Sequence, residues 1–480
     1  MTLSKEDYAR HDGLGLAALV ANKDVTPDEL LDCALAGVEA VNPKLNAVLN
    51  VIEDKARAEI KAGLPDGPFR GVPFMIKELV CHAAGVPSQG GSRLGIGVTF
   101  GHDTELMTRF RKAGVVTMAT TQTPEMGYNP TTETIAFGPT RNPWDTGRSP
   151  GGSSGGSGAV VAARIVPIAH ANDGGGSIRI PAAHNGLFGI KPTRSRVPAG
   201  PDSDLPLLGL ACEHIVSRSV RDSAVMLDAV AGPDIGAPSY PPAPSSPYAR
   251  DPGTPPGRLR IAVTSKTVAG TPVHPECVAA VASTAKLLAD LGHEVVEDSF
   301  TFDWEAYLKA THTVWVAGTS FFIDGYAGLS GRTPGPDTLE AITVKIYEEG
   351  KRIAAGEIMH ALSVFNHITR SVAQFYTKYD VVVTPTVADP PWTLGTVNQN
   401  DPDMSPADWT RQVFTWCPFT SLYNTTGQPS MSVPLHWTPD GLPVGVQFTG
   451  RFADETTLLR LAGQLEAARP WADRMPPVHI

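Results

Sequence analysis

Cysteine is scarce in this chain of 480 residues: only five are present, they are widely scattered, and no two form a CxxC pair. Such an odd, dispersed set argues against a disulfide scaffold and a cysteine-based zinc site, and reduced cytoplasmic thiols are the expected state. No uninterrupted apolar run approaches the ~18 residues of a membrane-spanning helix. The first residues, MTLSKEDYAR, are polar and charged, unlike a secretory signal peptide. We therefore expect a cytoplasmic protein without a membrane partner.

Basic clusters are also missing. The net charge is −10 and no long run of lysine or arginine occurs, which argues against a nucleic-acid-binding surface. The phosphate-loop patterns GxxxxGK[ST] and GxGxxG are absent, so a nucleotide cofactor is not expected. The length allows one large α/β domain or two to three ordinary ones. We expect no cofactor and no metal, and the oligomeric state cannot be derived from the sequence.

Helix and strand patterns alternate along the chain. Thr26 can cap a helix that Pro27 opens, and Glu29 completes a capping box before an apolar stripe that ends at Asn42-Pro43. Residues 72–76 are all apolar, which is typical of a strand buried on both faces, and Lys77 follows directly. Helix–glycine–strand units recur near residues 103–119 and 275–296. The fold class is therefore α/β, with a mixed, mainly parallel twisted sheet covered by helices on both faces.

The most unusual stretch is 148–192, which contains two glycine-flanked serine clusters. The first is Gly151-Gly152-Ser153-Ser154-Gly155-Gly156 and the second is Gly174-Gly175-Gly176-Ser177. Glycine in regular structure costs roughly 0.5–1 kcal/mol relative to alanine, so this density indicates backbone that turns sharply or approaches a ligand closely. Backbone N–H groups of glycines can surround an oxyanion, and a serine among them can be a nucleophile.

Two other interpretations deserve weight. The pattern GxSxG occurs twice, centred on Ser153 and Ser154, which raises an α/β-hydrolase esterase. The residues before the cluster do not form the apolar strand that such a serine turn requires, and His367 and His436 stand in no obvious catalytic loop. Lys77, taken alone, is more simply a lysine whose amine reaches solvent at the sheet edge.

The whole arrangement resembles the amidase signature family. The resemblance is carried by GGSSGGSG, by residues 173–181 (DGGGSIRIP), by GIKPT at 189–193 and by Gly71-Val72-Pro73 with Lys77, and it extends to GLPVGVQ at 441–447. The stretches 141–144 and 169–173 are most similar to 6-aminohexanoate-cyclic-dimer hydrolases and to related aryl-amide- and urethane-cleaving amidases. The resemblance implies hydrolysis of small amides or carbamates, with an esterase using the same site as the alternative.

The resemblance also implies a role for each site residue. Ser177 is the nucleophile, Ser153 is the bridging serine after a cis peptide bond, and Lys77 is the base. The oxyanion hole comes from the backbone N–H groups of Gly174, Gly175, Gly176 and Ser177. Structural support is expected from Ser154, Asp173 and Arg179, and substrate contacts from Met126, Gly127 and Tyr128.

This triad is chemically reasonable without a histidine. A serine hydroxyl is weakly nucleophilic without a base, and burial lowers the pKa of a lysine so that its amine can accept a proton. A hydroxyl both donates and accepts, so Ser153 can pass the proton between Ser177 and Lys77.

One departure from the family pattern is that Asn172 stands where the family often has threonine. A non-enzymatic binding protein that kept the fold is a third hypothesis, against which the intact triad speaks.

The regions follow from these assignments. Residues 1–480 form a single amidase domain, in which 65–232 are the core carrying the catalytic residues. Nine prolines mark 233–257 as a surface connection. Aromatic residues concentrate in 300–420, which we expect to vary and to shape the substrate side. Residues 421–480 return to the core.

Overall fold

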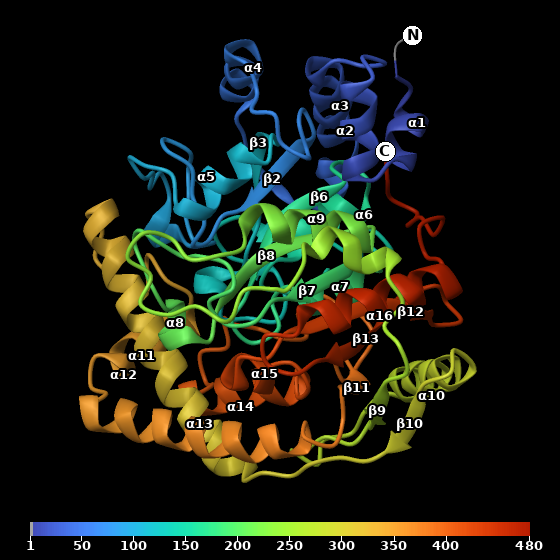
Figure 1. Cartoon of the computed structure of the whole chain (residues 1–480). Coiled ribbons are helices and arrows are strands. Elements are labelled where there is room, and N and C mark those ends of the chain that lie inside the picture. The colour runs from blue at the N-terminus through green and yellow to red at the C-terminus, as the bar shows by residue number, and fades with distance from the viewer. Residues whose placement is uncertain (1–2) are drawn as a thin grey trace.

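An eleven-stranded sheet runs through the part of the chain that this computed structural model describes, residues 3–480 (Figure 1). From one edge to the other, the strands are β1 (Val48–Val51), β3 (Val116–Thr121), β2 (Pro73–Lys77), β6 (Ile168–Asp173), β8 (Cys212–Ser217), β7 (Phe188–Lys191), β12 (Ser430–Trp437), β13 (Pro443–Thr449), β11 (Val381–Pro385), β9 (Arg260–Val263) and β10 (Glu294–Glu297). A separate hairpin pairs β4 (Glu133–Thr134) with β5 (Gly138–Pro139).

The mixed sheet expected from the sequence is confirmed, and its parallel pairs gather in two blocks. Strands β3, β2 and β6 are parallel, and so are β11, β9 and β10. Between the blocks, from β6 to β11, every neighbouring pair in the described residues is antiparallel. The alternation of helices and strands in the sequence did not predict this antiparallel centre of the sheet. Strands β12 and β13 are joined by residues 438–442, a connection too short for a parallel crossover.

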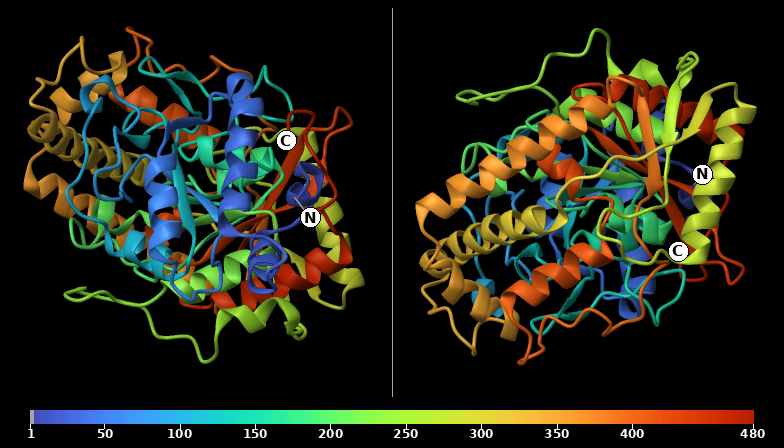
Figure 2. Two further views of the ribbon diagram at one scale, coloured as in Figure 1. Left: turned by 90° about the horizontal axis from the view of Figure 1, so that it is seen from above. Right: turned by 90° about the horizontal axis from the view of Figure 1, so that it is seen from below.

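Helices cover both faces of the sheet (Figures 1 and 2). They are α1 (Lys5–Arg10), α2 (Gly13–Ala21), α3 (Pro27–Leu45), α4 (Glu53–Ala62), α5 (Glu105–Lys112), α6 (Gly155–Ala162), α7 (Arg179–Asn185), α8 (Pro206–Gly209), α9 (Val220–Val230), α10 (Pro275–Asp290), α11 (Trp304–Ser330), α12 (Ala341–Gly350), α13 (Ala355–Phe375), α14 (Pro406–Trp416), α15 (Leu422–Thr426) and α16 (Glu455–Ala468).

Helix α3 confirms the predicted capping box, in which the Thr26 hydroxyl accepts from the Glu29 N–H and the Glu29 carboxylate accepts from the Thr26 N–H. The predicted stop at Asn42-Pro43 is two residues early, since the helix continues to Leu45. Proline in a last turn removes a single backbone hydrogen bond near the helix end, where the disruption is small.

The aromatic-rich region is largely helical. Helices α11, α12, α13 and α14 lie together at one side of the sheet, in yellow and orange in Figure 2. The proline-rich residues 233–257 contain no helix or strand beyond a short 3₁₀ segment, Tyr248–Gly253. This agrees with proline's missing N–H donor and fixed backbone angle.

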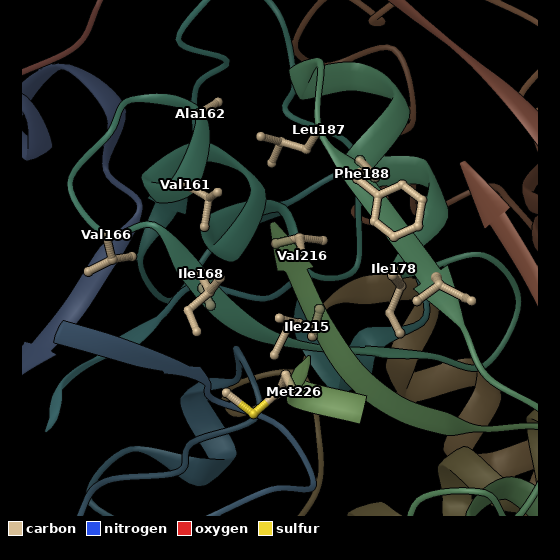
Figure 3. Packing of buried hydrophobic residues seen from close by; sticks show 14 of the residues in the cluster. Val161, Ala162, Val166, Ile168, Ile178, Leu187, Phe188, Ile215, Val216 and Met226 are labelled. Atoms are coloured by element: carbon tan, nitrogen blue, oxygen red, sulfur yellow. The ribbon is translucent and has the colours of Figure 1, made fainter. Parts of the chain in front are cut away.

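The main hydrophobic core surrounds the strands that carry the site. Figure 3 shows Val161 of α6, Ile168 of β6, Phe188 of β7, Ile215 of β8 and Met226 of α9 packed together, all of them buried. No two of the five cysteines are paired. Among residues 3–480, none of the helices has the length and apolarity needed to cross a bilayer.

Candidate active site

Lys77 is the last residue of β2 and is fully buried, with 0% of its side chain exposed. Strand β6 runs parallel beside β2, so the carboxyl ends of both strands meet at one edge of the sheet. There the Lys77 amine makes two short hydrogen bonds: Nζ lies 2.7 Å from Ser153 Oγ and 2.5 Å from Asn172 Oδ1. A buried amine is thus held in place by an alcohol and an amide oxygen.

Burial lowers the pKa of Lys77 from its usual 10.5 to about 7, against the opposing effect of the carboxylates of Glu213 and Asp173. Removal from water disfavours the charged form of an amine, which explains the direction. A substantial fraction of Lys77 is therefore neutral at pH 7, and a neutral amine can accept a proton. The complete burial of the side chain excludes the alternative that the Lys77 amine reaches solvent at the edge of the sheet.

A buried histidine–glutamate pair lies beneath the lysine. The Lys77 backbone N–H donates to His170 Nδ1 at 3.2 Å, and His170 Nε2 lies 2.7 Å from Glu213 Oε2. Because Nδ1 accepts, Nε2 carries the proton and donates it to the Glu213 carboxylate. Strands β2, β6 and β8 are thereby linked side by side, and an anion is placed below the amine of Lys77. Sequence reasoning missed this pair, since its members are 43 residues apart.

Ser153 lies in the loop immediately before α6, and the Gly152–Ser153 peptide bond is cis, as expected. The glycines of this loop are required by close packing: a Cβ on Gly152 would lie 2.5 Å from the Thr131 carbonyl oxygen. Ser154 exchanges hydrogen bonds with the backbone of Asn172, donating to its carbonyl at 3.2 Å and accepting from its N–H at 3.3 Å. The first serine cluster is thus fixed to the end of β6.

Asn172 is the residue that the sequence showed only as a departure from the family pattern. Its Oδ1 accepts from Lys77, and its Nδ2 donates to the Leu79 carbonyl at 2.9 Å. The second bond orients the amide so that its oxygen faces the amine. No strand was predicted for residues 168–173, so no signal in the sequence pointed to this contact.

The second glycine cluster connects β6 to α7. Gly176 has φ +144, and a Cβ there would lie 2.6 Å from Thr420 Oγ1 and 2.7 Å from Ile180 Cδ1, so only glycine fits. The Gly175 carbonyl accepts from Thr420 Oγ1 at 2.6 Å, and the Gly176 carbonyl accepts from the Ile180 N–H at 2.7 Å. In a trans peptide the N–H points away from the carbonyl. The N–H groups of Gly176 and Ser177 therefore point away from these two partners.

The backbone N–H groups of residues 174–177 are free. Within residues 3–480, none of the four donates a hydrogen bond to another protein group. Gly176 and Ser177 are buried, and buried backbone donors are normally satisfied, whereas Gly174 and Gly175 are partly exposed. Unpaired N–H groups beside a serine are the type of donor that stabilises a negatively charged oxygen.

Asp173 and Arg179 form a fully buried ion pair behind this loop. Arg179 donates from Nε and Nη2 to the two carboxylate oxygens, each at 2.9 Å, and also to the Thr420 carbonyl and to Gln447 Oε1. Burial acts to raise the pKa of Asp173, but Arg179 outweighs it and holds that pKa at about 2. Both groups are fully paired, which suits a supporting position.

Ser177 is 8% exposed and opens into a narrow cavity. The cavity has a volume of about 20 Å³, near the space of one water molecule. Aromatic rings form one wall: Tyr128 stacks on Trp315 at 4.5 Å, and Phe414 meets Trp315 edge-on at 5.8 Å. The remaining lining residues are Gly127, Asn129, Pro130, Gly175, Ile180, Val413 and Cys417.

Of the three substrate contacts expected from the sequence, two line this cavity, Gly127 and Tyr128. Met126 does not: its side chain packs in a separate buried cluster with Leu94, Val98 and Ile323. Its backbone has φ +52, in the left-handed region that is uncommon for a residue other than glycine. The sequence predicted only a region, 300–420, for the substrate side, and two aromatic residues of that region, Trp315 and Phe414, line the cavity beside Ser177.

The chain is similar over nearly its whole length to known amidases. The family described as Amidase matches residues 29–459. The chain is 37% identical to 6-aminohexanoate-cyclic-dimer hydrolase from Paenarthrobacter ureafaciens, over 99% of this chain and 98% of that protein. A solved structure of 6-aminohexanoate cyclic dimer hydrolase complexed with substrate superposes with a TM-score of 0.92 at 35% identity, covering 98% of this chain and 99% of the other.

A second solved structure extends the likeness. A bacterial aryl acylamidase of the amidase signature family superposes with a TM-score of 0.86 at 26% identity, covering 96% of this chain and 97% of that one. Both the family match and the relatives span nearly the whole chain. The protein belongs to the amidase signature family of hydrolases that cleave carbon–nitrogen bonds.

Proposed function

We propose that this protein hydrolyses the C–N bond of small amides through an acyl-enzyme formed on Ser177, with Ser153 and Lys77 as the proton relay. The observation that carries the proposal is the fully buried Lys77 amine, hydrogen-bonded to Ser153 Oγ at 2.7 Å. The link from Ser153 to Ser177 is the inferred step. It is supported by Gly127, which lines the Ser177 cavity. A Cβ added to this glycine would lie 3.4 Å from Ser153 Oγ, so Gly127 lies next to both serines.

The reaction would proceed in two halves. Ser177 Oγ attacks the amide carbonyl while its proton passes to Ser153, whose own proton moves to the neutral Lys77 amine. The carbonyl oxygen becomes negative and accepts from the free N–H groups of residues 174–177, each of which can contribute roughly 2.7–4 kcal/mol to lowering the barrier.

The proton then returns by the same route to the leaving nitrogen, the C–N bond breaks, and an amine departs. Water next loses a proton through the relay and attacks the Ser177 ester, which releases the carboxylic acid and restores the serine. This return step matters for amides in particular, because an amide nitrogen leaves poorly unless it is protonated. No step requires a metal or cofactor.

The substrate is proposed to be a small apolar amide, such as an aryl amide or a nylon-type oligoamide, with carbamates as further candidates. Aromatic surface beside Ser177 comes from Tyr128, Trp315 and Phe414. The proposal also draws on two similar proteins, which are named 6-aminohexanoate-cyclic-dimer hydrolase and aryl acylamidase. We propose that residues 300–420 shape this side of the site and that 65–232 carry its chemistry. The five unpaired cysteines favour a cytoplasmic location.

The experiment is an assay of purified protein on a matched set of a nitroanilide, the corresponding nitrophenyl ester and the corresponding carbamate. An amidase should cleave the anilide with a kcat/KM that is a sizeable fraction of that for the ester, and Ser177→Ala should abolish both activities. Ester cleavage without measurable anilide cleavage would instead support the esterase. A protein that cleaves none of the three and is not labelled by a serine-directed phosphonate would be a binding protein.

A further inference from the structure

Three side chains that can bind metal ions converge at a place away from the serines. His82 follows β2, His102 precedes α5, and Asp202 lies in the loop before α8. One ligand atom from each lies within 4.8 Å of the others, and this is the only such cluster of three or more among residues 3–480. Spacings of 20 and 100 residues form no recognisable motif, so no metal was expected from the sequence.

His82 is held in one orientation and one tautomer. Its side chain is 3% exposed and its ring stacks on Phe100 at 3.8 Å. Its Nδ1 lies 3.1 Å from the Val80 carbonyl oxygen, and a carbonyl can only accept, so Nδ1 carries the proton. A histidine whose other nitrogen donates to a backbone carbonyl is the usual arrangement around a bound metal.

The other nitrogen of His82 has no partner. Nε2 is buried and makes no hydrogen bond within the described residues. In the neutral ring this atom presents a lone pair, and it lies 3.4 Å from Asp202 Oδ2. A buried lone pair without a donor, next to a carboxylate oxygen, is unfavourable, and a positive charge bound by both atoms would relieve it. The remaining candidate ligand, His102 Nε2, lies 3.1 Å from both oxygens of Asp202.

The two separations that involve Asp202, 3.4 and 3.1 Å, are close to those between ligands of a tetrahedral metal ion. Zinc bonds to nitrogen and oxygen of about 2.1 Å place neighbouring ligand atoms about 3.4 Å apart. Two histidines and a carboxylate are a ligand set that Zn²⁺ and similar ions accept, with a fourth position for water. The nearby carboxylate of Asp103 is occupied by the Ala84 N–H and by Arg111.

We propose that His82, His102 and Asp202 bind one divalent transition-metal ion of the Zn²⁺ class. The ion would join three separate segments of the chain, one of which begins five residues after Lys77. Val80, which supplies the carbonyl for His82, has φ +70, a rare conformation for a β-branched residue that a bound ion would help to hold. The site does not touch the catalytic serines, so its role is to stabilise and not to activate water for catalysis.

The test is calorimetric titration of chelator-treated, full-length protein with ZnCl₂, together with thermal unfolding with and without the metal. We expect one ion per chain with a Kd in the micromolar range or tighter, and a rise in Tm that MgCl₂ does not produce. His102 and Asp202 are about half exposed, at 46% and 45%, so His102→Ala and Asp202→Ala should fold normally. Each should weaken binding at least about tenfold.

The matched control is His360→Ala, which removes an exposed histidine on α13 and should bind as the wild type does. Absorption of the Co²⁺-loaded protein in the visible range should report tetrahedral coordination and should be lost in both site variants. The proposal is overturned if Zn²⁺ does not bind stoichiometrically, or if it binds equally well to His102→Ala and Asp202→Ala. Unchanged binding in the two variants would place the ion at another site on the protein.

Discussion

At the scale of single residues, the proposed chemistry depends on one lysine amine whose charge is controlled by burial. Lys77 accepts a proton only when neutral, and its pKa is lowered to about 7. Activity should therefore be low at acidic pH and should rise to a plateau as the pH increases through about 7. The acid limb of kcat/KM against pH for a neutral amide measures this directly. An acid limb near pH 10 would contradict a buried, uncharged base.

Glu213 gives a sharper test of the same residue. Its carboxylate acts to raise the pKa of Lys77, so Glu213→Gln should lower that pKa and move the acid limb toward lower pH, by about one unit. Glu276→Gln is the matched control, because Glu276 pairs with His436 in the same way, at 2.8 Å, on α10 and β12. If the acid limb does not move in Glu213→Gln, or moves equally in the control, Glu213 does not control the pKa of Lys77.

Asn172 is predicted to position the lysine. Asn172→Leu removes the oxygen that accepts from Nζ at 2.5 Å, and kcat should fall by about 10–100-fold while KM changes little. Asn172→Thr, which restores an oxygen of the type common in the family, should recover part of the rate. Steady-state kinetics on one anilide measures both variants. A leucine variant with wild-type kcat would show that the amine needs no second partner.

At the scale of elements, the proposed mechanism uses the loop between β6 and α7 twice, for the Ser177 hydroxyl and for the unpaired backbone N–H groups beside it. Gly176→Ala should disturb the free N–H groups, since φ is +144 and the added Cβ would lie 2.6 Å from Thr420 Oγ1. We expect kcat to fall by about 100-fold or more in a protein whose circular dichroism is unchanged.

The control for that loop is Gly328→Ala. Gly328 lies on α11, where an added Cβ meets nothing within 4 Å, so activity should stay within about twofold of wild type. Near-normal kcat in folded Gly176→Ala would mean that the loop does not form the oxyanion hole.

At the scale of the whole molecule, the Asp173–Arg179 pair joins parts of the chain that are far apart. Through Arg179 the end of β6 is bound to Thr420, Asn424 and Gln447, in segments more than 240 residues later. Arg179→Leu leaves the Asp173 carboxylate buried without its cation, and the free energy of unfolding should fall by about 3–5 kcal/mol.

Urea unfolding measures this loss against a surface pair. Arg411→Leu breaks the exposed pair with Glu305, 51% and 67% exposed, and should leave the free energy of unfolding close to that of the wild type. Equal losses in the two variants would contradict the idea that the buried pair connects the C-terminal segments to the site.

The sequence predicted what local patterns encode. The capping box at Thr26, the buried strand before Lys77 and the helix–glycine–strand units all depend on neighbours a few residues apart. The antiparallel centre of the sheet, the His170–Glu213 pair and the aromatic wall of Trp315 and Phe414 depend on contacts between distant segments. No periodicity records such contacts, so they needed the three-dimensional structure.

The most direct test of the central claim is to map where a fluorophosphonate binds covalently, by intact mass and peptide mass spectrometry. The account predicts one adduct per chain, on Ser177, with none formed in Ser177→Ala and slower labelling in Lys77→Ala. An adduct on Ser153 or Ser154 in the wild type, or amide turnover that survives Ser177→Ala, would contradict it.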